Sequence, residues 1–291
     1  MIAWLFPGQG SQRPGMGEEL FVRYPELTEA ASDLLGWSVA GMCRSDDGRL
    51  DQTQYTQPAL FVVNALSYAD KLDRSGPARP GFLAGHSLGE LNALHAAGAM
   101  DFGTGVLLAA RRGEFMASCR KGGMAVVQGL TETEVREVLD GTELEVAGLN
   151  APAQVAVSGP RADVLRAREL FLKAGAADYV VLRVSGAFHS RLMAPAAAGL
   201  AVYLAAVPLR RPRIPVISNV TAAPYRGEPA DLLVRQLTSC VRWTASIEYL
   251  IAAGADPIEQ VGPGKAIGKL VRAIRSAATA AERRTEEASR V

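Results

Sequence analysis

Short apolar runs recur along the chain, and segments with apolar residues at helical intervals separate them. The runs predict buried strands at residues 2–6, 81–85, 214–220 and 257–262. The helical spacing covers residues 16–36, 57–76, 88–97 and 104–121, and the second of these helices is predicted to open near Pro58 and to end at Gly76. Strands that alternate with helices in this way indicate an α/β fold with a parallel sheet.

The pattern changes between residues 122 and 184. Strands are predicted at 124–130, 144–150, 153–159 and 178–184, with helices at 131–141 and 161–176. The order β-α-β-β-α-β is the ferredoxin-like pattern. Because buried strands resume at residue 214, we expect a small ferredoxin-like lobe (122–184) inserted into a large α/β lobe made of residues 1–121 and 185–291. The charged segment 281–291 is expected to be frayed or disordered.

Composition and charge narrow the class of protein. The 291 residues include 31 Lys and Arg and 30 Asp and Glu, so the charge gives no support for nucleic acid as a partner. No apolar run is long enough to span a membrane, and the N-terminal residues lack the features of a signal peptide. Cys43, Cys119 and Cys240 are far apart and are expected to be buried thiols. We expect a soluble cytoplasmic enzyme without a metal site.

Residues 85–89 (GHSLG) form a G-x-S-x-G pentapeptide between a predicted strand and a predicted helix. This context is typical of a nucleophile elbow, a sharp turn that presents the serine hydroxyl above the sheet. We therefore predict an α/β-hydrolase-like large lobe in which Ser87 is the nucleophile and the backbone N–H of Leu88 faces the oxyanion. The pentapeptide does not distinguish a hydrolase from an acyl transferase.

The serine needs a base, and the chain has three histidines. His86 adjoins the serine, where the elbow points it away from Oγ, and His95 is expected on a helix surface or in a core contact. His189, in a loop after the last small-lobe strand, is therefore the best available base. No acidic residue stands out as the third member of a triad, but a backbone carbonyl is also able to hold the Nδ1–H of a histidine.

Two further segments have candidate roles. The loop at residues 6–12 (FPGQGSQ) matches neither common phosphate-loop pattern, and its backbone N–H groups are candidates for the second oxyanion donor. Arg111 and Arg112 lie in an alanine-rich helix, where paired arginines are usually solvated. The alternative is that Arg112 turns inward and binds a substrate carboxylate, which would select acyl groups that end in a carboxylate.

Several motifs together resemble one family. They occur in the order FPGQGSQ, TQPAL, GHSLGE, RRGEFM, GLNAPAQVAVSG, VSGAFHSRLM, IPVISNVTA and VGPGK. This order is similar to that of malonyl-CoA:acyl-carrier-protein transacylases, from about Ile2 to Lys269. The chain most resembles the free-standing, trans-acting malonyltransferases of polyketide synthases, and the transacylase of fatty acid synthesis is the near alternative.

The resemblance implies roles for matching residues. Ser87 and His189 match the acylated nucleophile and the general base, and the backbone N–H groups of Gln9 and Leu88 match the oxyanion hole. The remaining matches concern substrate binding and support of the histidine: Arg112 pairs with the malonyl carboxylate, Gln57, Asn150 and Met116 line the same cleft, and the backbone carbonyl of Gln236 orients the histidine.

Phe188, which precedes His189, also matches the malonyl-selective members of the family. Methylmalonyl-selective members usually carry a serine there. The ring leaves less room for an α-methyl group, and one methyl group is worth about 10- to 200-fold in discrimination. The resemblance thus implies a preference for malonyl over methylmalonyl.

The implied reaction is ping-pong transfer of malonyl from malonyl-CoA, through a malonyl-serine, to the phosphopantetheine thiol of an acyl carrier protein. No bound cofactor is implied, and family members are commonly monomeric. One alternative is an acyl-carrier-protein thioester hydrolase of the same fold, which has no need of a carboxylate clamp such as Arg112. The other alternative is a non-catalytic module that only docks carrier protein, and the presence of Ser87 and His189 opposes it.

Overall fold

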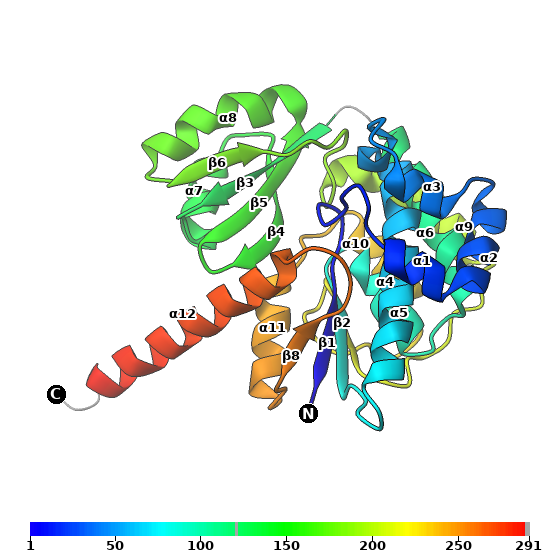
Figure 1. Cartoon of the computed structure of the whole chain (residues 1–291). Helices are drawn as coiled ribbons and strands as arrows, with labels where there is room; N and C mark the ends of the chain where they lie inside the picture. The colour runs from blue at the N-terminus through cyan, green and yellow to red at the C-terminus, as the bar shows by residue number, and fades with distance from the viewer. Residues whose placement is uncertain (120–121, 289–291) are drawn as a thin grey trace.

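The computed structural model describes residues 1–119 and 122–288. Figure 1 shows two lobes, each built around its own sheet. The larger lobe has a parallel sheet in the order β7-β2-β1-β8, formed by β1 (Ala3–Phe6), β2 (Phe82–Gly85), β7 (Val216–Ile217) and β8 (Ile258–Gln260). The predicted α/β fold with a parallel sheet is confirmed.

The two faces of the parallel sheet pack against different cores. Trp4 and Phe6 of β1 contact one apolar cluster, and Ala3 and Leu5 contact the other, because successive strand residues point to opposite faces. The surrounding helices are α1 (Glu18–Arg23), α2 (Pro25–Leu35), α3 (Val39–Arg44), η1 (Arg49–Asp51), α4 (Thr53–Arg74), α5 (Gly89–Ala96), α6 (Phe102–Ser118), η2 (Arg191–Met193), α9 (Ala194–Leu204), α10 (Ala230–Gln236), α11 (Trp243–Ala252) and α12 (Ala266–Ala288).

Two predicted helix boundaries are wrong, and both involve proline. The single helix expected at 16–36 is two helices, because Pro25 lacks the N–H that would continue α1 and instead opens α2. Helix α4 begins at Thr53 rather than near Pro58, which lies inside the helix. The long buried face of α4 stabilises it despite the missing hydrogen bond, because tertiary packing outweighs local propensity.

The C-terminal segment also differs from the prediction. Helix α12 continues through residues 281–288, which were expected to be frayed or disordered, and Figure 1 shows its end extending away from both lobes. Alanine, glutamate and arginine, which dominate this segment, are strong helix formers. Residues 289–291 of the same prediction, and residues 120–121 of the helix predicted at 104–121, lie outside the described residues.

The small lobe has the antiparallel order β4-β5-β3-β6 that the ferredoxin-like pattern predicts. Its elements are β3 (Gly122–Gln128), α7 (Glu132–Leu139), β4 (Glu145–Ala151), β5 (Gln154–Pro160), α8 (Arg161–Lys173) and β6 (Asp178–Val181). Ala125 and Val127 pack with Val164 of α8, whereas Met124 belongs to the core shared with the large lobe. One face of the small sheet thus lies toward the large lobe. The division of the chain at residues 122 and 184 stays a prediction.

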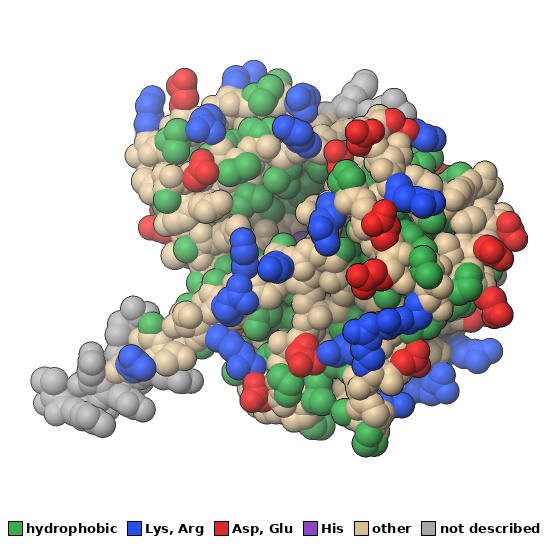
Figure 2. Space-filling model, in the orientation of Figure 1, with side chains coloured by type: hydrophobic (Ala, Val, Ile, Leu, Met, Phe, Trp, Pro, Cys, Tyr) green, Lys and Arg blue, Asp and Glu red, His purple; other side chains and the backbone are tan. Residues whose placement is uncertain are grey.

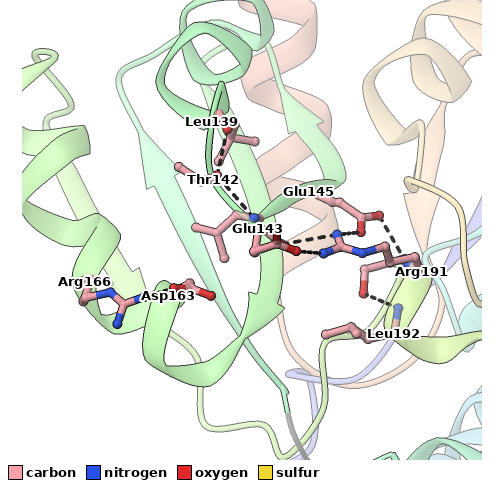
Figure 3. Close-up of polar contacts among 10 residues, drawn as sticks. Leu139, Thr142, Glu143, Glu145, Asp163, Arg166, Arg191 and Leu192 are labelled. Atoms are coloured by element: carbon pink, nitrogen blue, oxygen red, sulfur yellow. Dashed lines mark hydrogen bonds and ion pairs between the residues drawn. The ribbon is translucent and has the colours of Figure 1, made fainter.

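Arg191 joins the two lobes just after the loop that carries His189. Figure 3 shows its guanidinium between the carboxylates of Glu143 and Glu145 at the start of β4, and it forms ion pairs with both. The backbone N–H of Arg191 also donates to Glu145 Oε2 at 3.1 Å. These contacts hold the edge of the small sheet against the segment that follows His189.

Candidate active site

The carboxyl ends of three neighbouring parallel strands deliver the first site residues to one edge of the sheet. Phe6 pairs with Gly85, so the FPGQG loop after β1 lies beside the turn after β2. A Cβ on Gly8 would lie 2.2 Å from the backbone oxygen of His86, which shows how closely the two loops approach. Asn219 follows β7, the other neighbour of β2. Gln9, Ser87 and Asn219 therefore meet at this edge.

Ser87 occupies the predicted elbow between β2 and α5. Its φ of 51° lies in the left-handed region, which is unfavourable for a residue other than glycine. The Asn219 side chain holds the turn from both sides, since Oδ1 accepts from the Ser87 N–H and Nδ2 donates to the Gly85 carbonyl, each at 2.7 Å. These hydrogen bonds stabilise a conformation that the serine backbone would otherwise avoid.

We expect Gly89→Ala to destabilise the fold, because a Cβ at this position would lie 2.2 Å from the carbonyl oxygen of Phe6. Relieving an overlap with backbone requires β1 and α5 to separate, and we expect a loss of about 3 kcal/mol in the free energy of unfolding, measured by urea denaturation. Gly227→Ala is the matched control, because a Cβ there meets nothing within 4 Å. Equal stability of the two variants would contradict this account of the elbow.

The structure brings Ser87 and His189 together from the two halves of the large lobe. Ser87 Oγ lies 2.8 Å from His189 Nε2, and His189 Nδ1 lies 2.8 Å from the backbone oxygen of Gln236. A carbonyl oxygen only accepts, so Nδ1 carries the proton and Nε2 is left to accept from the serine hydroxyl. These contacts have the geometry of a catalytic triad in which a backbone carbonyl takes the place of the carboxylate.

His189 is buried and neutral. Burial and the nearby charge of Arg112 lower the pKa of His189 to about 3, although the hydrogen bond to the Gln236 carbonyl opposes this. An imidazole held neutral at physiological pH is in the form that accepts a proton.

The same shift predicts a pH effect on stability. The unfolded chain protonates this histidine below about pH 6.5, whereas the folded protein does so only near pH 3. The contribution of His189 to stability is therefore lost as pH falls from 6.5 toward 3, by about 2 kcal/mol at pH 5, whereas the raised pKa of Glu90 acts in the opposite direction. His189→Gln removes only this contribution, so we expect the difference between variant and wild type in the free energy of unfolding to change by about 2 kcal/mol, in favour of the variant, between about pH 7.5 and about pH 5, as measured by urea unfolding. The same pH dependence in the variant and in wild type would contradict the assignment.

Arg112 is the charged group at the serine. Its side chain is 1% exposed, and it donates to Ser87 Oγ at 3.1 Å and to the side-chain oxygens of Gln57 and Gln236 at 2.7 Å each. Arg111, its neighbour, lies on the exposed face and pairs with Glu114. Burial lowers the pKa of Arg112 to about 10, so the guanidinium stays charged at neutral pH. Of the two arginines, Arg112 is thus the one that turns inward.

A cavity of about 170 Å³ opens beside Ser87, between the lobes. Figure 2 shows a hollow between the lobes, with hydrophobic side chains on its small-lobe side and Lys and Arg side chains around its rim. Nine of the predicted site residues line the cavity: Gln9, Gln57, Ser87, Leu88, Arg112, Met116, Asn150, Phe188 and His189. Its apolar wall includes Met124, Val126 and Ala156 of the small sheet, which the sequence interpretation did not single out.

The other two histidines have different partners. His86 contacts Asn150, with Nε2 2.9 Å from Asn150 Oδ1. This contact links β4 of the small lobe to the elbow. His95 is partly buried and packs against the rings of Phe61 and Phe102. His189 alone among the three hydrogen bonds to Ser87 Oγ in the described residues.

The sequence analysis did not predict three buried polar residues near the site: Glu90, Asn219 and Tyr225. Glu90 follows Ser87 by one helical turn, and its carboxylate accepts from the hydroxyl of Tyr225 and the side-chain amide of Gln236. Asn219 lies two residues after β7, but the strand predicted at 214–220 included it, so the prediction gave it no separate role. Nothing in the local sequence marks Tyr225 as a partner of Glu90, because the two residues are 135 positions apart.

The expectation of three buried thiols is wrong for two of them. All three cysteines are free, but only Cys43 is buried, whereas Cys119 and Cys240 are partly exposed. Cys119 directly follows the end of α6, and Cys240 precedes the segment that bridges to the small sheet, so each packs at the edge of an apolar core and not inside it. Within the described ranges, no group of three or more His, Cys, Asp or Glu residues is placed to hold a metal ion. No helix in that part of the chain is long and apolar enough to cross a membrane.

Comparison with known sequences identifies relatives over nearly the whole chain. Residues 3–284 match the acyl transferase domain family. The chain is 45% identical over 289 residues to the polyketide biosynthesis malonyl CoA-acyl carrier protein transacylase PksC of Bacillus subtilis, which covers 97% of this chain and 100% of PksC. It is 46% identical over 279 residues to the polyketide biosynthesis protein ThaF of Burkholderia thailandensis, which covers 94% of this chain but only 24% of ThaF.

Solved structures give the same result. A malonyl CoA-acyl carrier protein transacylase from Burkholderia pseudomallei superposes with a TM-score of 0.91 and 44% identity, over 95% of this chain and 98% of that one. The malonyl-transacylase in a complex with a type II PKS acyl-carrier protein (PlMCAT:AntF) has a TM-score of 0.87 and 34% identity, over 94% and 92% of the two chains. The motif-based resemblance is confirmed, and the chain belongs to the acyl transferase domain family, among the malonyl CoA-acyl carrier protein transacylases.

Proposed function

We propose that this protein transfers malonyl from malonyl-CoA to the phosphopantetheine thiol of an acyl carrier protein. The observation that carries the proposal is the buried Arg112, whose guanidinium contacts Ser87 Oγ at 3.1 Å. An acyl group on Ser87 would be bonded to that oxygen as an ester. A malonyl group there would place its free carboxylate within reach of the Arg112 guanidinium. Arginine pairs with carboxylates through two parallel hydrogen bonds, which gives both affinity and orientation.

In the first half of the reaction, Ser87 Oγ attacks the malonyl thioester carbonyl while His189 Nε2 takes the serine proton. The backbone N–H groups of Gln9 and Leu88 stabilise the tetrahedral oxyanion, a role supported by their place in the cavity wall. The C–S bond then breaks, His189 returns the proton to the departing thiolate, and coenzyme A leaves. The product is a malonyl ester of Ser87.

In the second half, the carrier thiol gives its proton to His189 Nε2 and its sulfur attacks the ester carbonyl. The C–O bond breaks, Ser87 regains a proton from His189, and the malonyl thioester of the carrier protein leaves. Throughout, the Gln236 carbonyl holds the Nδ1–H of His189, which keeps the imidazole in the tautomer that both halves need. A carboxylate is therefore not required next to the histidine.

The walls of the cavity fit a small acyl group that has a carbonyl at one end and a carboxylate at the other. Gln57 and Met116 lie beside Arg112, since the Gln57 amide bonds both the guanidinium and, at 3.2 Å, the Met116 sulfur. Phe188 is buried next to His189 and lines the cavity, where its ring would leave less room for an α-methyl group. These contacts support malonyl as the preferred acyl group over methylmalonyl.

The biological setting follows from the relatives. PksC is named for polyketide biosynthesis, and its whole length corresponds to this chain. We propose that the protein acts in trans on carrier proteins of a polyketide synthase, in the cytoplasm and as a monomer. The Lys and Arg side chains around the hollow in Figure 2 are suited to the phosphates that coenzyme A and the carrier-bound phosphopantetheine share.

Intact-protein mass spectrometry after mixing with malonyl-CoA tests the proposal. We expect a malonyl adduct on Ser87 that persists when no carrier protein is present. Rapid release of free malonate would instead indicate the thioester hydrolase, and the absence of any adduct would indicate a non-catalytic docking module. Either of these results would overturn the proposed function.

A further inference from the structure

Glu90 is a buried carboxylate that the reaction steps above do not use. It is 0% exposed and lies on α5, directly behind the catalytic serine. Its carboxylate accepts from the Tyr225 hydroxyl, from the Gln236 side-chain amide and from the Asn219 backbone N–H at 3.2 Å. Several donors around a buried carboxylate fix its orientation and favour its negatively charged form.

The residues that contact Glu90 also contact the catalytic groups. Asn219 accepts from the Ser87 N–H, and the backbone carbonyl of Gln236 holds His189 Nδ1. The Gln236 side chain additionally donates to the Ser87 carbonyl at 3.0 Å and accepts from Arg112 at 2.7 Å. Glu90 is therefore connected, through Asn219 and Gln236, to the groups that act as nucleophile, base and carboxylate clamp in the proposed reaction.

The Gln236 side chain has only one orientation that satisfies these contacts. Its Nε2 faces acceptors on Glu90, the Ser87 backbone and the Asn219 side chain, and its Oε1 faces the donor Arg112. An ionised Glu90 only accepts, so it enforces this orientation. A protonated carboxyl group also donates, and it would permit the flipped amide, which would turn an N–H donor toward the Arg112 guanidinium.

We propose that ionised Glu90 is a positioning residue for acylation, which acts through Gln236 to hold His189 and Arg112 in their reactive places. This inference rests on the proposed function, because it concerns the rate at which Ser87 accepts malonyl. The negative charge of Glu90 also balances the buried Arg112 from the opposite side of the Gln236 amide.

The surroundings of Glu90 give this role a pH dependence. Burial raises the pKa of Glu90 to about 7, although hydrogen bonds from Tyr225 and Gln236 and the charge of Arg112 lower it. The titratable groups that act on it are Tyr225, from the segment after β7, and Arg112, from α6. Since His189 stays neutral far below pH 7, the loss of acylation rate on the acidic side should follow Glu90 rather than the histidine.

The experiment measures the rate of Ser87 acylation by quenched-flow mass spectrometry from about pH 5.5 to about 8.5. Saturating malonyl-CoA removes the effect of titrating the coenzyme A phosphates on binding. We expect Glu90→Gln to lower the rate about 10- to 100-fold at high pH, the size of effect that a misplacement of about 1 Å produces. We also expect this variant to lose the decline in rate near pH 7.

Tyr225→Phe provides a second variant that keeps the carboxylate. Removing a donor to Glu90 should raise its pKa further, so the decline in rate should move to higher pH. Tyr179→Phe is the matched control, because Tyr179 is also buried and donates one hydrogen bond, to the Val164 carbonyl in the small lobe. We expect its pH profile to equal that of wild type.

Three results would overturn the inference: a Glu90→Gln rate within about 2-fold of wild type, an unchanged decline near pH 7 in Glu90→Gln, or an unshifted decline in Tyr225→Phe. If Glu90→Gln fails to fold, the pH at which the acylation rate of Tyr225→Phe declines tests the inference. A wild-type protein that is never acylated would instead overturn the proposed function.

Discussion

Ser87→Ala is expected to abolish malonyl loading of a carrier protein, with a loss of about 10⁶-fold in turnover. The loss is this large because both halves of the reaction pass through an ester on Ser87 Oγ, and no other hydroxyl occupies that place beside His189 in the described residues. The measurement is the rate at which a carrier protein with its phosphopantetheine arm gains the mass of malonyl.

Ser67→Ala is the matched control for this change. Its hydroxyl donates to the Val63 carbonyl within α4, so the variant loses one serine hydrogen bond away from the cavity. We expect wild-type loading from it. If the purified Ser87→Ala protein still charges carrier protein at a comparable rate, the assignment of the nucleophile is wrong.

Arg112→Ala is expected to shift acyl selectivity toward groups without a carboxylate. A hydrogen-bonded charge pair of this kind contributes about 3 kcal/mol, which corresponds to about 100-fold in kcat/KM for malonyl-CoA. Acetyl-CoA has no carboxylate to lose contact with, so its kcat/KM should fall much less. The measurement is the ratio of the two specificity constants.

Arg111→Ala controls for the removal of an arginine from the same helix, because Arg111 is exposed and pairs with Glu114. Its selectivity should match that of wild type. An unchanged preference for malonyl over acetyl in Arg112→Ala would show that the guanidinium does not bind the malonyl carboxylate.

The sequence predicted those parts of the site that have a local sequence motif or that require a residue type with few representatives in the chain. The G-x-S-x-G context predicted the turn at Ser87, and the scarcity of histidines led to His189. Both side chains lie where that reasoning required, 2.8 Å apart. The inward turn of Arg112 was one of two alternatives, and only the packing of α6 against the cavity distinguishes it from its neighbour.

The parts that were not predicted depend on contacts between distant segments. The orienting group of His189 is a backbone carbonyl, which every residue possesses, so only the family resemblance indicated Gln236. Glu90 meets Gln236 across 146 positions of sequence, and no local pattern encodes that contact. The helix errors at Pro25 and Pro58 have a related cause, because tertiary packing decides whether a proline ends a helix or is tolerated inside it.

The central claim is that the acceptor of the malonyl group is a carrier thiol and not water. The most direct test isolates the malonyl-Ser87 protein by rapid desalting and divides it between buffer, carrier protein without phosphopantetheine, and carrier protein with it. We predict that the adduct mass disappears rapidly only in the last sample, where the carrier gains the malonyl mass in equal amount. Loss of the adduct at the same rate in all three samples, with release of free malonate, would contradict the account.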